Sequence, residues 1–206
     1  MSFAEYVRTF DNEWWRITLL GEPLMMVPLA LIVLVWLWRS CGARTMLAWG
    51  GLLVLGGSLL VAQKLLYYVG GFSLSSIRLY TMSGHSLAAS YIYGSLAAIV
   101  ARGWPAGCRW AVYVLAAGLI LAIAVSRVAV AQHRPSEAIG GLTLGVLLLA
   151  CYLRFYWSRA RTHLAGWTLT LPCLLVMALT YGHVFEFENI FRQAGRWANP
   201  GVRFYR

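Results

Sequence analysis

Charged residues are scarce in this 206-residue sequence: Asp, Glu, Lys and Arg together make up 12% of it, about half the share usual in a soluble domain. Lysine is almost absent, since Lys64 is the only one. Hydrophobic residues make up 60% and fall in long blocks rather than at the spacing of an amphipathic surface helix. Such blocks predict a protein that folds in a lipid bilayer.

Cysteine is also scarce, and the four cysteines form no disulfide framework. Cys151 and Cys173 lie inside apolar blocks, while Cys41 and Cys108 lie in short loops. The sequence contains no Cys-x-x-Cys motif and no Cys/His cluster that would indicate zinc. We therefore expect no metal and no other cofactor.

Acidic residues number 7 against 17 basic ones, which gives a net charge of +10. An excess of this size occurs in nucleic-acid-binding proteins. Here, however, the arginines lie in short segments between apolar blocks, where membrane topology places them. We expect the bilayer as partner and no nucleic acid; the sequence leaves the oligomeric state open.

Six apolar blocks are long enough to cross a hydrocarbon core of about 30 Å, which takes roughly 20 helical residues. They lie near Glu22–Trp38, Met46–Val69, His85–Ala101, Arg109–Arg127, Ser136–Tyr156 and Ala165–Phe185. A backbone in lipid must satisfy its own hydrogen bonds, so the fold class is all-α. Gly141 and Gly145 form a Gly-x-x-x-Gly pair, which predicts close packing between helices.

Three units follow from this pattern. Residues 1–21 mix aromatic, acidic and arginine residues at spacings of three and four, which predicts an amphipathic helix lying in the membrane interface. Residues 22–185 form the six-helix transmembrane domain, and residues 186–206 form a C-terminal tail.

The loop charges predict the orientation. Arginines follow the first, third and fifth blocks, and these loops share one side of the membrane: Arg39, Arg44, Arg102, Arg109, Arg154, Arg159 and Arg161. Cytoplasmic loops are enriched in such residues, so this side is expected to face the cytoplasm. The basic tail is an exception to this rule. Short loops and this charge pattern suit a bacterial inner membrane, with both termini outside.

The remaining ionisable residues gather at the opposite, outer face, in three clusters that are distant in sequence. The most informative runs from Ser126 to Glu137. Pro135 suits the first turn of a helix, which places His133 at the helix start and Glu137 one turn inside. A carboxylate there can hold one imidazole nitrogen and leave the other as a nucleophile. Arg127 supplies a planar fork of donors for phosphate oxygens.

The second cluster, Ser83-Gly84-His85, precedes the third apolar block. Free N–H groups at a helix start bind anions, so Ser83 and Gly84 are candidate phosphate ligands. His85 is a candidate general acid. Lys64, near the end of the second block, and Arg78, in the loop that follows, are further candidate phosphate ligands.

At these residues the sequence resembles the type 2 phosphatidic acid phosphatase superfamily. The family has three motifs: Lys-x6-Arg-Pro, Pro-Ser-Gly-His and Ser-Arg-x5-His-x3-Asp. The third is matched from Ser126 to His133, with Glu137 in place of the final aspartate, and the second at Ser83-Gly84-His85, with Met82 in place of proline. Lys64 matches the first lysine, but Gly71-Phe72 replaces Arg-Pro. The resemblance extends from about Lys64 to Tyr156.

The resemblance implies a metal-independent, two-step hydrolysis of a membrane lipid phosphate. His133 would form a phosphohistidine, with Glu137 orienting it, and His85 would protonate the leaving group. Positive groups would stabilise the phosphoryl oxygens: Arg127, Lys64, Arg78 and the amides near Ser83, Gly84 and Ser126.

The sequence leaves the substrate open. Undecaprenyl pyrophosphate and a phosphatidic-acid-like lipid are the leading candidates, since the site would open toward headgroups. Two other functions also stay open: transfer of the phosphate to another lipid such as lipid A, and a non-catalytic membrane subunit or lipid-binding scaffold. The intact histidine pair favours an enzyme, and the missing Arg-Pro favours the scaffold.

Overall fold

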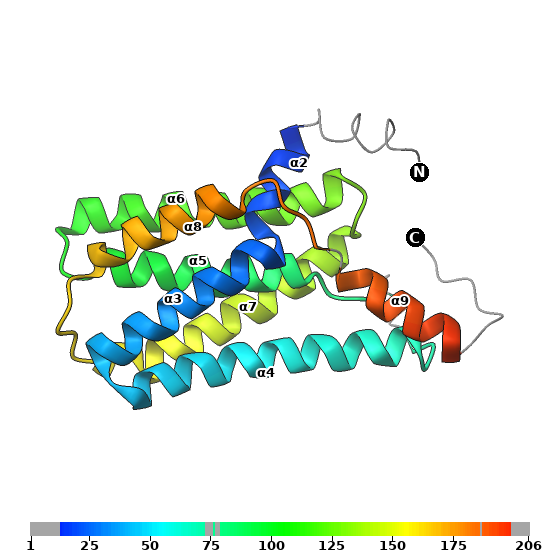
Figure 1. Cartoon of the computed structure of the whole chain (residues 1–206), viewed down its shortest axis with the longest axis horizontal. Helices are drawn as coiled ribbons and strands as arrows, with labels where there is room; N and C mark the ends of the chain where they lie inside the picture. The colour runs from blue at the N-terminus through cyan, green and yellow to red at the C-terminus, as the bar shows by residue number, and fades with distance from the viewer. Residues whose placement is uncertain (1–12, 73–75, 77–78, 186, 199–206) are drawn as a thin grey trace.

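The computed structural model describes residues 13–72, 76, 79–185 and 187–198, and the elements within these ranges are helices (Figure 1). A short α2 (Glu13–Thr18) and a 3-10 turn η1 (Leu19–Gly21) lead into the bundle. The long helices are α3 (Pro23–Cys41), α4 (Ala43–Tyr68), α5 (Gly84–Val100), α6 (Ala106–Ala129) and α7 (Pro135–Phe155). The 3-10 turns η3 (Trp157–Arg159) and η4 (Gly166–Leu169) then lead to α8 (Thr170–Thr180) and α9 (Phe187–Ala198).

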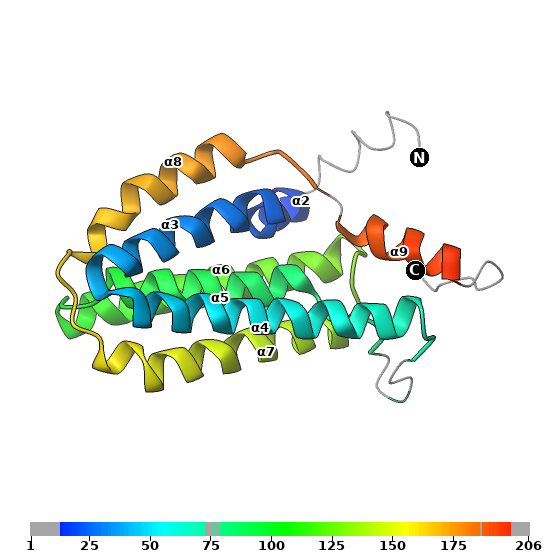
Figure 2. The same cartoon turned by 60° about the horizontal axis from the view of Figure 1, so that its bottom comes forward.

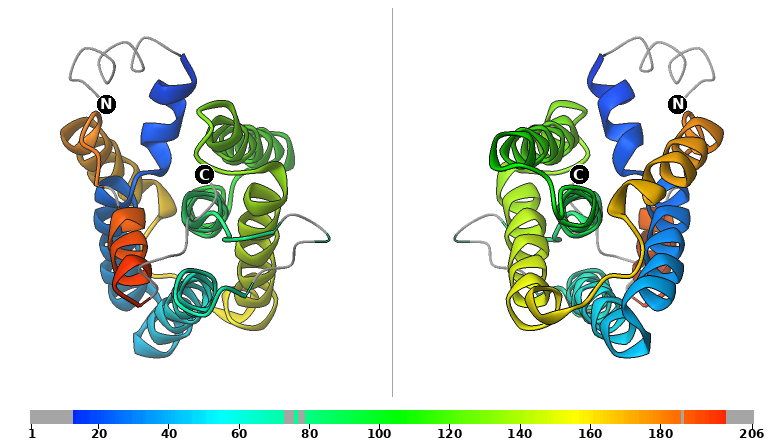
Figure 3. Two further views of the ribbon diagram at one scale, coloured as in Figure 1. Left: turned by 90° about the vertical axis from the view of Figure 1, so that its right-hand side faces the viewer. Right: turned by 90° about the vertical axis from the view of Figure 1, so that its left-hand side faces the viewer.

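Helix α5 occupies the centre of the bundle. It contacts α3, α4, α6 and α7, and the view along the bundle shows it enclosed by them (Figure 3). Its serines are buried, and two of them satisfy their hydroxyls within the helix: Ser90 Oγ donates to Ser86 O at 2.6 Å and Ser95 Oγ to Tyr91 O at 2.6 Å. Small side chains of this kind let neighbouring helices approach closely in lipid.

Helix α7 packs closely against α5 through the Gly141 and Gly145 pair. A Cβ atom at Gly141 would lie 2.2 Å from Ser83 O, and one at Gly145 would lie 2.6 Å from Leu87 O. Both distances are too short for any side chain, so only glycine fits. The predicted close packing at this pair is confirmed.

In the part of the chain that the structure describes, four helical stretches are long and apolar enough to cross a membrane: Glu13–Cys41, Ala43–Tyr68, Ala106–Ala129 and Pro135–Arg159. Their outward faces carry exposed apolar side chains, for example Val27, Leu31 and Val35 on α3, Val54 on α4, and Leu115 and Leu121 on α6. Such a surface needs lipid around it, which is the character of an integral membrane protein.

The sixth predicted span, Ala165–Phe185, is a shorter helix. Its first residues form η4, and α8 has 11 residues before the chain turns at Gly182, whose φ of +90° ends the helix. Helix α8 packs along α3, on the outside of the bundle (Figure 2). Helix α5, with 17 residues, is also shorter than the four spans.

The two ends of the chain differ from the sequence prediction in part. Residues 1–12 lie outside the described residues, and the described part of the interfacial segment is α2, which packs against α6. The predicted tail contains a helix, α9, which lies beside the end of α4 (Figures 1 and 2). Its sequence is strongly amphipathic, with an exposed Ile190 and Trp197, as in a helix at a membrane surface.

Candidate functional site

The antiparallel order of the helices brings the predicted site residues to one end of the bundle. The last turns of α4 and α6 and the first turns of α5 and α7 meet there (Figure 1). These turns carry the ionisable side chains Lys64, His85, Arg127 and Glu137, with His133 in the connection between α6 and α7. Buried charges are costly in a membrane protein and mark functional sites.

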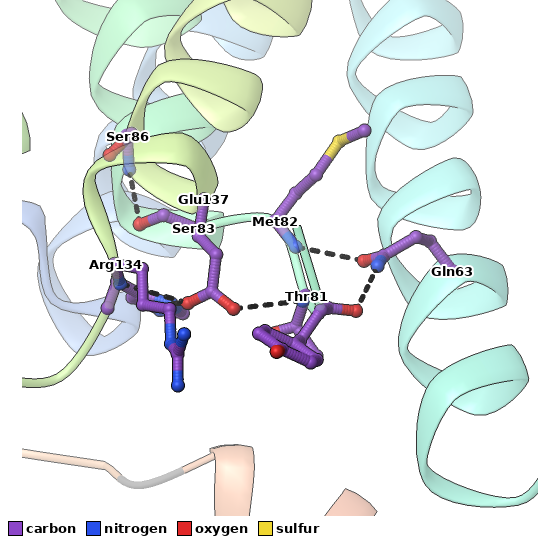
Figure 4. Close-up of polar contacts among 9 residues, drawn as sticks. Gln63, Thr81, Met82, Ser83, Ser86, Arg134 and Glu137 are labelled. Carbon is purple, nitrogen blue, oxygen red and sulfur yellow. Dashed lines mark hydrogen bonds and ion pairs between the residues drawn. The ribbon is translucent and has the colours of Figure 1, made fainter. Parts of the chain in front are cut away.

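His133 and Glu137 form a hydrogen-bonded pair. His133 Nδ1 lies 3.0 Å from Glu137 Oε2, and both side chains are less than a tenth exposed. The same carboxylate oxygen accepts a bond from the Arg134 N–H at 3.1 Å, and Oε1 accepts one from the Thr81 N–H at 3.1 Å (Figure 4). The carboxylate is thus fixed, and it holds Nδ1 of the imidazole. Nε2 is the nitrogen left to act on a substrate.

The surroundings of His133 keep its imidazole neutral. Burial lowers the pKa of this group below its ordinary value of 6.5. The positive charges of Arg127 and Lys64 lower the pKa further, against the raising effect of the Glu137 hydrogen bond. A neutral imidazole has the free electron pair that a nucleophile needs.

The segment before α5 is tied to two helices. Ser83 N–H donates to Glu137 O at 3.0 Å, and Met82 N–H donates to Gln63 Oε1 at 2.9 Å (Figure 4). Ser83 Oγ caps α5 by accepting a bond from Ser86 N–H at 3.3 Å. The Ser83 amide and hydroxyl, predicted as phosphate ligands, are therefore engaged within the fold. Gly84 is the first residue of α5, a position where helix N–H groups generally lack partners within the helix and can bind an anion.

Arg127 is buried at the end of α6 and contacts the segment before α3. Its NH1 donates to Thr18 Oγ1 at 3.0 Å and lies 3.7 Å from Glu22 Oε1. The same Glu22 oxygen lies 2.9 Å from His85 Nε2. Arg127 and His133 both interact electrostatically with the His85 imidazole, so these groups share one site.

Sequence reasoning missed Glu22 and Thr18. Glu22 was counted as the first residue of an apolar block, and both residues lie outside the region that resembles the phosphatases. The available signal was a carboxylate directly before Pro23 at the head of a membrane helix, where an ionisable residue normally has a function.

The other predicted residues differ in their placement. Lys64 is buried, and its Nζ lies 5.6 Å from the centre of the Phe191 ring on α9. Ser126 Oγ donates to Ile123 O at 2.7 Å in its own helix, so its hydroxyl is not directed at the charged groups. Arg78 lies outside the described residues. Arg134 is half-buried, with its guanidinium 4.7 Å from the centre of the Tyr80 ring.

Across the described ranges, no group of three or more His, Cys, Asp or Glu side chains is arranged to hold a metal ion.

The chain is weakly similar to a protein of unknown function. The chain is 26% identical over 142 residues to an uncharacterised 22.5 kDa protein in the cps region of Klebsiella pneumoniae, which covers 68% of each chain. No protein-family model matches the chain, and no solved structure matches it significantly.

Proposed function

We propose that this protein is an integral membrane lipid phosphatase that acts through a phosphohistidine on His133. The observation that carries the proposal is the buried His133–Glu137 pair, with Nδ1 held and the imidazole neutral, beside the cations Arg127 and Lys64. A histidine held by a carboxylate is a nucleophile, and two buried cations supply charge stabilisation for a phosphoryl group.

In the proposed reaction, Nε2 of His133 attacks phosphorus, and the bond to the leaving oxygen breaks as His85 protonates that oxygen. Water then attacks the phosphohistidine and releases phosphate. Arg127 and Lys64 stabilise the negative charge on the equatorial oxygens, which is the main requirement of phosphoryl transfer. The resemblance to type 2 phosphatidic acid phosphatases, over residues 64–156, supports the same roles.

We further propose that all six apolar helices lie in a bacterial inner membrane, with the site at the periplasmic end. The arginines at the other end of the bundle support this orientation. Arg102, for example, donates to Ala160 O at 2.6 Å and to Trp157 O at 3.2 Å, which ties two of the arginine-bearing connections together. A site at the level of the headgroups favours a lipid phosphate or pyrophosphate as substrate.

The first test is phosphate release in detergent with EDTA from a panel that includes undecaprenyl pyrophosphate and phosphatidic acid. Wild type is compared with His133→Ala and with the matched control His163→Ala, whose exposed side chain lies at the opposite end. We expect release by wild type and the control, and none by His133→Ala. If no lipid is hydrolysed, the hydrolase proposal fails; adding lipid A as an acceptor then tests transfer.

A further inference from the structure

The chain before α3 is built into the site. Tyr93 OH on α5 donates to Leu20 O at 2.7 Å, and Glu22 N–H donates to Leu19 O at 3.2 Å. Gly21 is packed so tightly that an added Cβ would lie 2.8 Å from Ile123 Cγ2 and 3.4 Å from two atoms of His85. This packing fixes the backbone that carries the Glu22 carboxylate.

Glu22 is 4% exposed, and a carboxylate buried this deeply needs partners. Its Oε1 contacts two of the proposed catalytic groups, and the distance is shorter to His85 Nε2, at 2.9 Å, than to Arg127 NH1, at 3.7 Å. Arg127 has Thr18 Oγ1 as a closer acceptor, at 3.0 Å. The direct hydrogen bond of the carboxylate is therefore to the histidine.

We propose that Glu22 is the positioning carboxylate of His85, and that the site contains two carboxylate–histidine pairs with complementary tasks. Glu137 orients the nucleophile His133, and Glu22 orients the acid His85. This inference rests on the proposed function. It assigns a role to a residue that lies outside all three motifs of the resemblance.

The charges around His85 explain why it needs a carboxylate. Burial and the positive charge of Arg127 from α6 both disfavour a positive charge on this imidazole. Glu22, at the start of α3, is the negative group that acts on His85. It increases the affinity of the imidazole for a proton, which a general acid must carry at the moment of transfer.

Glu22 makes and breaks no covalent bond in the proposed reaction and keeps its charge throughout. The Glu22 carboxylate accepts the Nε2–H bond of His85, so Nδ1 is the nitrogen that exchanges the catalytic proton. As the His133 N–P bond forms, the P–O bond breaks, its electron pair stays on the leaving oxygen, and the proton from His85 neutralises that oxygen. Neutral His85 then takes a proton from the water that attacks phosphorus, and the N–P bond breaks with its electron pair returning to Nε2 of His133, which restores both histidines.

The test compares two leaving groups. An alkoxide, as released from short-chain phosphatidic acid, needs a proton in the transition state, whereas p-nitrophenolate from p-nitrophenyl phosphate does not. The quantity measured is kcat/KM, which reports the step that expels the leaving group. The variants are Glu22→Gln, which keeps the shape and removes the charge, and the control Glu13→Gln, whose side chain is 75% exposed.

We expect Glu22→Gln to lower kcat/KM for the alkyl phosphate at least about tenfold, and by no more than the roughly 10²–10⁴-fold that a general acid contributes. The aryl phosphate should lose less than about threefold, and Glu13→Gln should match wild type. His85→Gln should give the same selective loss, and adding Glu22→Gln to it should cost nothing further, because the two residues act as one unit.

Three results would overturn the role. Equal losses on both substrates would make Glu22 only structural. A gain on both would make it an anion that competes with phosphate for Arg127. Additive losses of kcat/KM in the double variant would show that Glu22 acts independently of His85. Should Glu22→Gln fail to fold in a thermal unfolding assay, Glu22→Asp keeps the charge at a shorter reach, and the alkyl-selective loss is expected there too. A wild type that releases no phosphate from these two substrates or from any lipid of the panel refutes the proposed function itself.

Discussion

Replacing Gly141 with alanine should separate α7 from α5 at the site. The added Cβ would lie 2.2 Å from Ser83 O, which is about 1.2 Å closer than the 3.4 Å at which ordinary van der Waals contact begins. The obstacle is a backbone carbonyl, so no side chain can rotate away. The helices themselves must move apart by roughly this distance.

A displacement of that size breaks hydrogen bonds that hold the site. Ser83 N–H to Glu137 O is 3.0 Å and Thr81 N–H to Glu137 Oε1 is 3.1 Å, and another ångström removes both. Overpacking costs about 1–3 kcal/mol, and each lost hydrogen bond adds about 0.5–1.5 kcal/mol. Because the carboxylate also holds His133, phosphatase activity should fall about 100-fold, as expected for a catalytic group misplaced by about 1 Å.

The assay is thermal unfolding in detergent micelles together with phosphate release. The matched control is Gly51→Ala on the exposed face of α4, where nothing lies within 4 Å of the added Cβ. We expect Gly141→Ala to lower the unfolding temperature by several degrees and Gly51→Ala to leave it unchanged or raise it, because alanine favours helix. An unfolding temperature and an activity equal to wild type in Gly141→Ala would refute the packing argument.

Three further predictions follow from the contacts at the site. Because His133 must be unprotonated and its pKa is lowered by burial, the acid limb of kcat/KM against pH should lie below pH 6.5. The positive charge of Lys64 also lowers this pKa, so Lys64→Met should raise it and move the acid limb to higher pH. Glu137→Gln should reduce phosphate release by about 10²–10⁴-fold, since the imidazole loses its orienting carboxylate, and full activity would contradict the pairing. Phe191→Ala should speed amine-reactive labelling of Lys64, the only lysine, while Trp197→Ala, exposed at 81%, should not; equal labelling rates would show that α9 does not cover the lysine.

The helical core was predictable because its signals are local. Long apolar blocks, Pro135 at a helix start and the Gly141–Gly145 pair each define a helix or its packing within a few residues of sequence. The blocks do not define how many helices span the membrane, since α8 has 11 residues where a span of 21 was expected. Helix α8 is shortened by a turn at Gly182 and by a 3-10 turn that begins at Gly166. The hydropathy of the sequence reveals neither feature.

The all-α class and the membrane character follow from the amino-acid sequence alone. So does the His133–Glu137 pair, because the two residues are four apart and a helix start at Pro135 places them side by side. The contact of Glu22 with His85, 63 residues away, and that of Thr18 with Arg127, 109 residues away, are visible only in the folded protein. Contacts at such separations depend on how α3, α5 and α6 pack. In the folded protein the Ser83 amide is also bonded to Glu137 O. Spacing along the chain encodes the neighbours within one helix, whereas the partners of a buried charge are set by the helices that surround it.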